Sequence, residues 1–234
     1  MAHVDVARLR QIRRNGWRMR VARLVMTLRY RPAPSHFLDY QTRTELHLPF
    51  EGEWFVHWGG RSMGQNRHAR AVDQRFAYDF VIVRNGYSCR LEKISNEDYY
   101  CFGQPILAPA DGLVREVRND VADNQPGLMN RDAIGGNYLI LEHGNDEYSF
   151  LAHLRQGSVR VEAGDRVTRG VVLGECGNSG HSTEPHLHYH LQNTSPWFNG
   201  EGLPAFFCNY LVKGERIGRG EPRGGSFVSP EGGR

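Results

Sequence analysis

Three histidines at alternate positions form the densest group of chemically reactive side chains in the sequence. The segment PHLHYHL, residues 185–191, is typical of a short β-strand. Residues two apart in a strand point to the same face, so His186, His188 and His190 would share one face. Imidazole binds metal ions and also exchanges protons near neutral pH. The segment therefore indicates a metal site or a catalytic site.

A second candidate strand supplies a carboxylate. In QRFAYDFVIV, residues 74–83, Asp79 alternates with Ala77 and Val81, while aromatic side chains occupy the opposite face. A carboxylate among small and apolar neighbours is either a buried hydrogen-bonding group or a metal ligand. This pattern makes Asp79 a candidate ligand.

Two more histidines complete the reactive groups. His68 lies upstream of Asp79 in NRHARAVD, and His153 lies at the end of the candidate strand YSFLAHL. Two histidines, one carboxylate and an open fourth position form a known catalytic zinc set. The remaining histidines would then be available for proton transfer.

Short strands are the elements that must position these side chains. The segments QRFAYDFVIV, LVREV, NYLILEH, YSFLAHL, SVRV and HLHYHL are rich in β-branched or aromatic residues and are separated by glycine turns. The 27 glycines and 11 prolines also favour tight turns over long helices. The sequence predicts an all-β, antiparallel domain.

The two ends of the chain differ from this β-rich region. Apolar residues recur at helical spacing from Val6 to Leu28, among arginines, and RPAPSHF reads as an extended linker. We expect a helical arm and linker over 1–38, a domain over 39–212, and a Gly-rich tail over 213–234 that is disordered. The stripe of the arm would pack on the domain, lie on a membrane surface, or contact an anionic cell-wall polymer.

Charge and hydropathy exclude several classes of protein. Residues 1–38 hold nine arginines against the single acid Asp5, while the remainder of the chain is net acidic. A nucleic-acid enzyme would keep positive charge around its site, so we expect no nucleic-acid partner. The sequence has no apolar run of about 18 residues that would cross a membrane, and arginines interrupt every candidate signal peptide.

The four cysteines show no CxxC spacing, which argues against a zinc knuckle or a thioredoxin-type pair. Cys89 and Cys101 flank a polar stretch that could be the end of a hairpin. Two interpretations stay open: a disulfide between these two residues, or four reduced thiols.

Several motifs together resemble the lysostaphin-type (LytM-type) zinc metalloendopeptidases, which cut peptides of bacterial peptidoglycan. The motifs are PHLH, LAHL, APADG and VEAGDRVTRGVVLGECGNSG, and the resemblance covers roughly residues 50–192. It implies a catalytic domain of the lysostaphin-like (duplicated hybrid motif) type. It also implies that Zn²⁺ is the cofactor and that a peptidoglycan peptide is the substrate.

The resemblance assigns a role to five of the reactive residues. His68, Asp79 and His188 fall on the three zinc ligands of the family. His153 and His186 fall on its two catalytic histidines that do not bind zinc, and either of them could be the general base. The family also implies action in the cell envelope or outside the cell, by an export route that this chain does not reveal.

The segment that supplies the first ligand departs from the common family pattern. The common motif is HxxxD, but Arg75 lies four residues before Asp79. The chain instead resembles a branch with a longer interval ending in QRFAxDF, in which Asn66 and His68 precede the aspartate. His57 as the first ligand and Asp73 in place of Asp79 are the alternatives.

Two binding modules compete with the peptidase interpretation. One is a degenerate, non-catalytic family member that binds or activates a partner. The other is a lipoyl-like carrier domain, but a carrier needs a lysine at a hairpin tip, and neither Lys93 nor Lys213 lies in that context. Because all five expected positions can be filled, the sequence favours catalysis.

Overall fold

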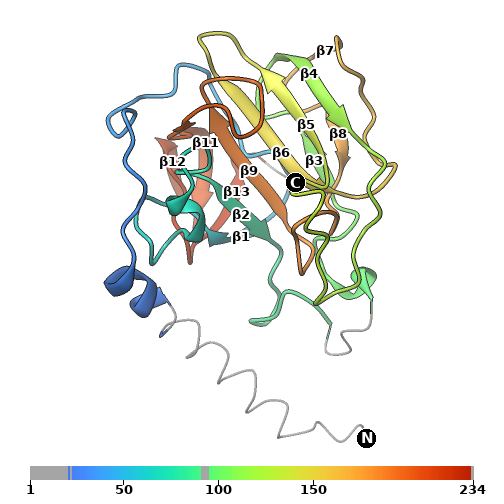
Figure 1. The fold of residues 1–234 in the computed structure, drawn as a ribbon, viewed down its shortest axis with the longest axis horizontal. Helices are drawn as coiled ribbons and strands as arrows, with labels where there is room; N and C mark the ends of the chain where they lie inside the picture. The colour runs from blue at the N-terminus through green and yellow to red at the C-terminus, as the bar shows by residue number, and fades with distance from the viewer. Residues whose placement is uncertain (1–20, 22, 91–94, 233–234) are drawn as a thin grey trace, which may run out of the picture.

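Antiparallel strands dominate the computed structural model, which describes residues 21, 23–90 and 95–232 (Figure 1). Two short 3-10 helices, η1 (Arg67–Arg70) and η2 (Asn96–Asp98), interrupt them. The strands are β1 (Trp54–Trp58), β2 (Tyr78–Val81), β3 (Pro105–Leu107), β4 (Gly112–Arg118), β5 (Asn137–Glu142), β6 (Tyr148–Leu154), β7 (Arg166–Val167), β8 (Val172–Glu175), β9 (Leu187–Gln192), β10 (Gly202–Leu203), β11 (Phe207–Val212), β12 (Glu215–Gly220) and β13 (Phe227–Pro230).

Most of these strands belong to one sheet, in the order β12-β11-β13-β1-β2-β9-β6-β5-β4-β7, with β10 paired to β9. β3 and β8 form a separate two-stranded sheet. The paired strands are antiparallel throughout. The prediction of a mostly antiparallel β-fold is confirmed.

The central strands β2 and β9 each have one face in the hydrophobic core and one face that carries polar side chains. Tyr78 and Phe80 of β2 pack with Leu187 and Tyr189 of β9 in the hydrophobic core, and all four side chains are fully buried. Burial of an aliphatic or aromatic side chain of this size contributes about 1.5–3 kcal/mol. Because side chains alternate along a strand, the same packing directs Asp79 and the histidines of β9 to the opposite face.

The N-terminal arm lies largely outside the described residues, which exclude 1–20 and 22. Residues 23–29 are helical, but Leu24, Val25 and Leu28 are exposed. The Arg23 guanidinium instead donates a hydrogen bond to the backbone carbonyl of His57 at 2.8 Å. For residues 21 and 23–29, packing of the apolar stripe on the domain is therefore the wrong interpretation. No helix in the described part of the chain is long and apolar enough to span a bilayer.

The C-terminal segment is folded, so the prediction of a disordered tail is wrong for residues 213–232. β12 pairs with β11, and β13 lies between β11 and β1. The glycine-rich composition suggests disorder. Backbone hydrogen bonds nevertheless hold these strands in the sheet, and Val228 adds a buried side chain. The sheet thus continues beyond residue 212, where we had placed the end of the domain.

Replacement of Val228 by alanine should destabilise the domain, because its side chain is 1% exposed between two strands. The loss of two buried methyl groups should lower the free energy of unfolding by about 1.5 kcal/mol. Val171→Ala, at a 41% exposed position, is the control and should have little effect. Urea denaturation would measure both variants, and an unchanged Val228→Ala protein would favour the disordered tail.

Two smaller predictions also differ from the structure. SVRV, residues 158–161, is not a strand, although Val159 and Val161 do pack against the core. No disulfide joins the cysteines: Cys101 donates a hydrogen bond from Sγ to the carbonyl of Pro185, and all four cysteines are buried thiols. The open choice at Cys89 and Cys101 is therefore decided in favour of reduced thiols.

Candidate metal and catalytic site

Asp79 and His188 lie opposite each other because β2 and β9 pair in that register. Directly opposed residues in an antiparallel pair have Cβ atoms about 4.5–5.5 Å apart, so their side chains meet. Nδ1 of His188 is 3.0 Å from Oδ1 of Asp79, and both side chains are buried. Strand pairing alone thus brings together two residues that are far apart in the sequence.

His68 comes from η1 rather than from the sheet. The buried side chain of Asn66 caps this helix, accepting a hydrogen bond from the backbone N–H of His68 at 2.9 Å. Asn66 also donates to the carbonyl of Gly60 at 3.1 Å, which anchors the turn. Nε2 of His68 lies 3.1 and 3.0 Å from the two carboxylate oxygens of Asp79.

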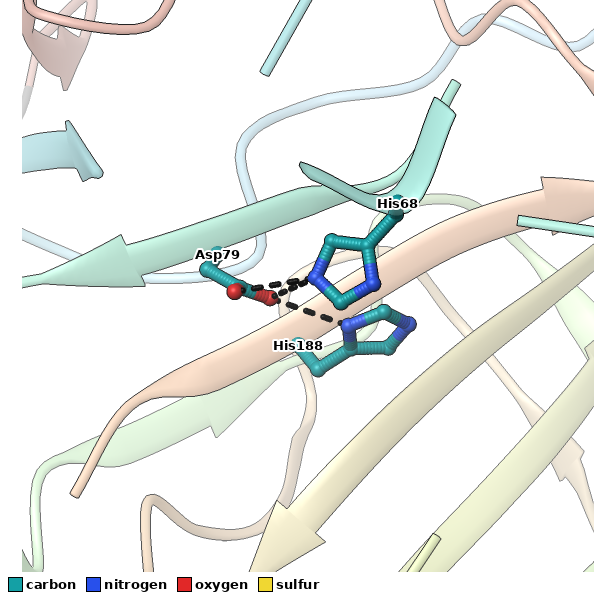
Figure 2. A group of neighbouring side chains, drawn as sticks. All are labelled: His68, Asp79 and His188. Carbon is teal, nitrogen blue, oxygen red and sulfur yellow. Dashed lines mark hydrogen bonds and ion pairs between the residues drawn. The ribbon is translucent and has the colours of Figure 1, made fainter. Parts of the chain in front are cut away.

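These three side chains converge from η1, β2 and β9 on one point (Figure 2). One ligand atom from each of His68, Asp79 and His188 lies within 4.8 Å of the others. Ligands at about 2.0–2.1 Å from a tetrahedral zinc ion are themselves about 3.3 Å apart. The donor types and their spacing therefore fit a metal ion such as zinc, and the three residues form a candidate metal site.

The carboxylate of Asp79 is ionised, as a metal ligand must be. Burial alone would raise its pKa, but His68, His186 and His188 outweigh burial and hold the pKa well below the usual range. Arg67 adds a positive charge, with its guanidinium 3.3 Å from Oδ2 of Asp79. The site therefore surrounds one buried negative charge with donors and positive charge.

His153 reaches the same face through an irregularity in β6. Tyr138 of β5 pairs with Ala152 and Asn137 pairs with Leu154, so His153 is an extra residue in the ladder. Its φ angle is +62°, a left-handed conformation that costs a non-glycine residue of order 1 kcal/mol or more. A regular strand would direct His153 to the same face as Leu151, which is in the core, so this bulge is what turns His153 toward the other histidines.

His186 lies beside His153, with ring centroids 4.8 Å apart. Nδ1 of His186 is 2.8 Å from the carbonyl of Glu184, and Nδ1 of His153 is 2.8 Å from the carbonyl of Ser179. A carbonyl oxygen only accepts, so each Nδ1 carries the proton and each Nε2 keeps its lone pair. Among the described residues Nε2 of His186 has no hydrogen-bond partner, and it lies 3.7 Å from Oδ1 of Asp79.

Both histidines are neutral in this environment. Burial lowers the pKa of His186, and burial together with His186 and His188 lowers the pKa of His153 well below its ordinary value. A neutral imidazole with a free Nε2 lone pair can accept a proton. The two rings are therefore suited to proton transfer next to the candidate metal site.

The two alternative ligands are not part of this group. Within the described residues, the metal-capable group contains neither His57 nor Asp73. His57 lies near Asp79, and burial lowers the pKa of His57 to about 4. Burial raises the pKa of Asp73, whose carboxylate is 3.4 Å from the side-chain amide of Gln74.

Replacement of His57 by alanine should therefore leave the metal content unchanged, whereas His68→Ala should lose the metal. His68 directs a ring nitrogen at Asp79, and removing it takes away one of three donors. Metal analysis of both purified variants tests this assignment. Loss of metal from His57→Ala and retention by His68→Ala would make His57 the first ligand.

His190 is a further histidine beside this group, and the family resemblance assigns it no role. Its Nδ1 lies 3.0 Å from Nε2 of His188, the ring nitrogen that faces away from Asp79. The alternation in PHLHYHL already placed His190 on the same strand face as His188. That signal was available, but it could not show that the two rings touch.

Part of the chain is similar to a known peptidase family. Residues 97–200 match the model of peptidase family M23, a span that includes His153, His186 and His188 but not His68 or Asp79. Residues 97–200 are therefore similar to peptidase family M23.

Two characterised relatives show the same similarity over short spans. The chain is 35% identical over 89 residues to the peptidoglycan DD-endopeptidase ShyA of Vibrio cholerae serotype O1, covering 38% of this chain and 17% of that protein. It is 32% identical over 95 residues to the glycyl-glycine endopeptidase ALE-1 of Staphylococcus capitis, covering 40% and 22%. The chain thus spans less than a quarter of the length of either relative.

Similarity to a solved structure is weaker. The M23 metalloprotease pseudoalterin is 14% identical over 75% of this chain and 95% of its own, with a TM-score of 0.44. A TM-score of this size carries no argument about the site.

Proposed function

We propose that this chain is a zinc-dependent endopeptidase that hydrolyses peptide bonds in the stem peptides or cross-bridges of peptidoglycan. The observation that carries the proposal is the convergence of His68, Asp79 and His188, with His153 and His186 beside them. The similarity to peptidase family M23 and the endopeptidase relatives support the choice of reaction and substrate. Peptidoglycan as the substrate places the site of action in the cell envelope or outside the cell.

The three proposed ligands would hold the ion from one side and leave a position open. When bound there, zinc would lower the pKa of a bound water to about 7 and would polarise a peptide carbonyl. Asp79 and His188 are held by strand pairing, and His68 by the Asn66 cap, so the donors are already arranged.

His153 and His186 would move the protons. One Nε2 takes a proton from the attacking water and delivers it to the nitrogen that leaves as an amine. The other ring would first take up a proton from solvent at Nε2 and would then donate a hydrogen bond to the oxygen of the attacked carbonyl, where negative charge develops. Both rings carry the proton on Nδ1, so either His153 or His186 could be the general base.

The alternative is a non-catalytic, peptidase-like module that binds or activates a partner. Such a module would not need two neutral histidines with free Nε2 lone pairs beside a complete donor set. The test is digestion of purified, cross-linked peptidoglycan with the zinc-loaded protein. We expect new amino groups and shorter peptides, and binding of peptidoglycan without any cleavage would support the alternative.

We also propose that the arginine-rich arm makes a peripheral contact with an anionic membrane or cell-wall polymer. Nine arginines against one acid in residues 1–38, together with the exposed Leu24, Val25 and Leu28, support this contact. Positive charge and an apolar stripe are the features that bind a helix to an anionic surface.

Removal of residues 1–22 should weaken binding to anionic vesicles or walls and leave hydrolysis of a soluble peptide unchanged. This truncation keeps Arg23 and its hydrogen bond to the carbonyl of His57. Binding of the intact chain should also be more sensitive to salt, since screening weakens exposed charge interactions. Sedimentation with vesicles at two salt concentrations measures both effects, and equal binding by both proteins would contradict the proposal.

A further inference from the structure

His190 is a buried histidine next to a proposed zinc ligand. It is 1% exposed, and its Nδ1 lies 3.0 Å from Nε2 of His188. Phe150, directly opposite on β6, stacks on the ring with centroids 4.4 Å apart and planes 14° apart. Trp197 packs edge-on at 5.4 Å. These contacts hold the His190 ring in one orientation.

The direction of the hydrogen bond between the two rings follows from the site. If His188 binds zinc through Nδ1, which faces Asp79, its proton must be on Nε2. Nε2 then donates, so Nδ1 of His190 must accept and the proton of His190 must be on its own Nε2.

Gln192 provides the next acceptor on the same strand face. Its amide Nε2 donates to the carbonyls of Thr194 at 3.0 Å and Pro196 at 2.9 Å, which fixes the amide orientation. Oε1 of Gln192 and Nε2 of His190 are both buried and both lack a hydrogen-bond partner in the described part of the chain.

We propose that His190 and Gln192 are positioning residues that fix the tautomer and the ring orientation of His188. The amide of Gln192 selects the Nε2–H tautomer of His190, and His190 then accepts from Nε2–H of His188. This order leaves the lone pair of His188 at Nδ1, directed toward Asp79. The inference rests on the proposed function only in taking His188 as a zinc ligand.

The first test is the zinc affinity of the full chain, measured by competition with a chromophoric chelator. Loss of a partner that orients a metal-binding histidine typically weakens metal binding about 10- to 100-fold. We expect a loss of this size in His190→Phe, which keeps a ring but has no acceptor. His190→Asn places an amide oxygen at the position of Nδ1 and should recover most of the affinity.

His143→Phe is the control for removing a half-buried, hydrogen-bonded histidine outside the site. His143 contacts Ser149 at 2.8 Å and the carbonyl of Asp111 at 2.7 Å, and it is not part of the candidate metal site. Its replacement should lower the melting temperature and leave zinc affinity unchanged. Zinc binding by His190→Phe within about twofold of the wild type, or equal losses in the Phe and Asn variants, would overturn the inference.

A second measurement needs no variant. In the zinc-loaded wild type with ¹⁵N-labelled histidine, NMR should show His190 protonated on Nε2 and a coupling between His188 Nε2 and His190 Nδ1. A proton on Nδ1 of His190 would overturn the inference and leave the proposed function intact. A wild type that binds no zinc would instead overturn the proposed function, and this inference with it.

Discussion

Asp79→Ala should abolish both zinc binding and hydrolysis. The carboxylate contacts His68 and His188 and is the negative charge at the centre of the site. Its removal leaves only two histidine ligands, so the loss of zinc affinity should exceed the 10- to 100-fold that loss of an orienting partner costs. Turnover should fall to the level of the uncatalysed reaction. Metal analysis and peptide release from purified peptidoglycan measure the two effects.

Asp73→Asn is the control for this substitution. Asp73 is also a buried aspartate close to His68, but it does not belong to the group that can hold a metal. The variant should keep its zinc and its activity. Zinc bound at the wild-type level by Asp79→Ala, with loss of zinc from Asp73→Asn, would give the ligand role to Asp73.

His153→Ala and His186→Ala should keep zinc and lose most of their turnover. Neither ring is among the three proposed ligands, and each has a free Nε2 lone pair close to the site. General acid–base catalysis typically contributes about 10²- to 10⁴-fold, and each variant should lose activity in that range. Zinc content and kcat measured on the same preparations separate this effect from loss of the metal.

The double variant distinguishes two cooperating rings from two independent ones. If His153 and His186 act in one proton-transfer sequence, removing both should cost little more than removing either alone. Loss of zinc from a single variant would make that histidine a ligand. Full activity in either single variant would remove that ring from the mechanism.

Most of what the sequence could predict about this site comes from the alternation of side chains between the two faces of a strand. Alternation placed the histidines of β9 on one face and separated Asp79 from the aromatic face of β2, as the structure shows. The partner of Asp79 could not be read from the sequence. Register depends on how two distant strands pair, and only the structure shows Asp79 opposite His188.

The orientation of His153 could not be predicted from the sequence, because it depends on an irregularity in the backbone of β6. His153 faces the other histidines because of a bulge and a left-handed φ, and neither has a signal in YSFLAHL. The C-terminal strands were missed for a related reason. Their glycine-rich composition resembles a disordered chain, but pairing with β1 and β11 supplies the order that their side chains lack.

Zinc titration of the metal-free protein tests the central claim most directly. Hydrolysis of purified peptidoglycan should be absent without metal and should rise to a plateau at one zinc ion per chain, because one set of three ligands is proposed. The same titration of His188→Ala should stay flat. Full hydrolysis by the metal-free wild type, or none at any zinc concentration, would contradict the account.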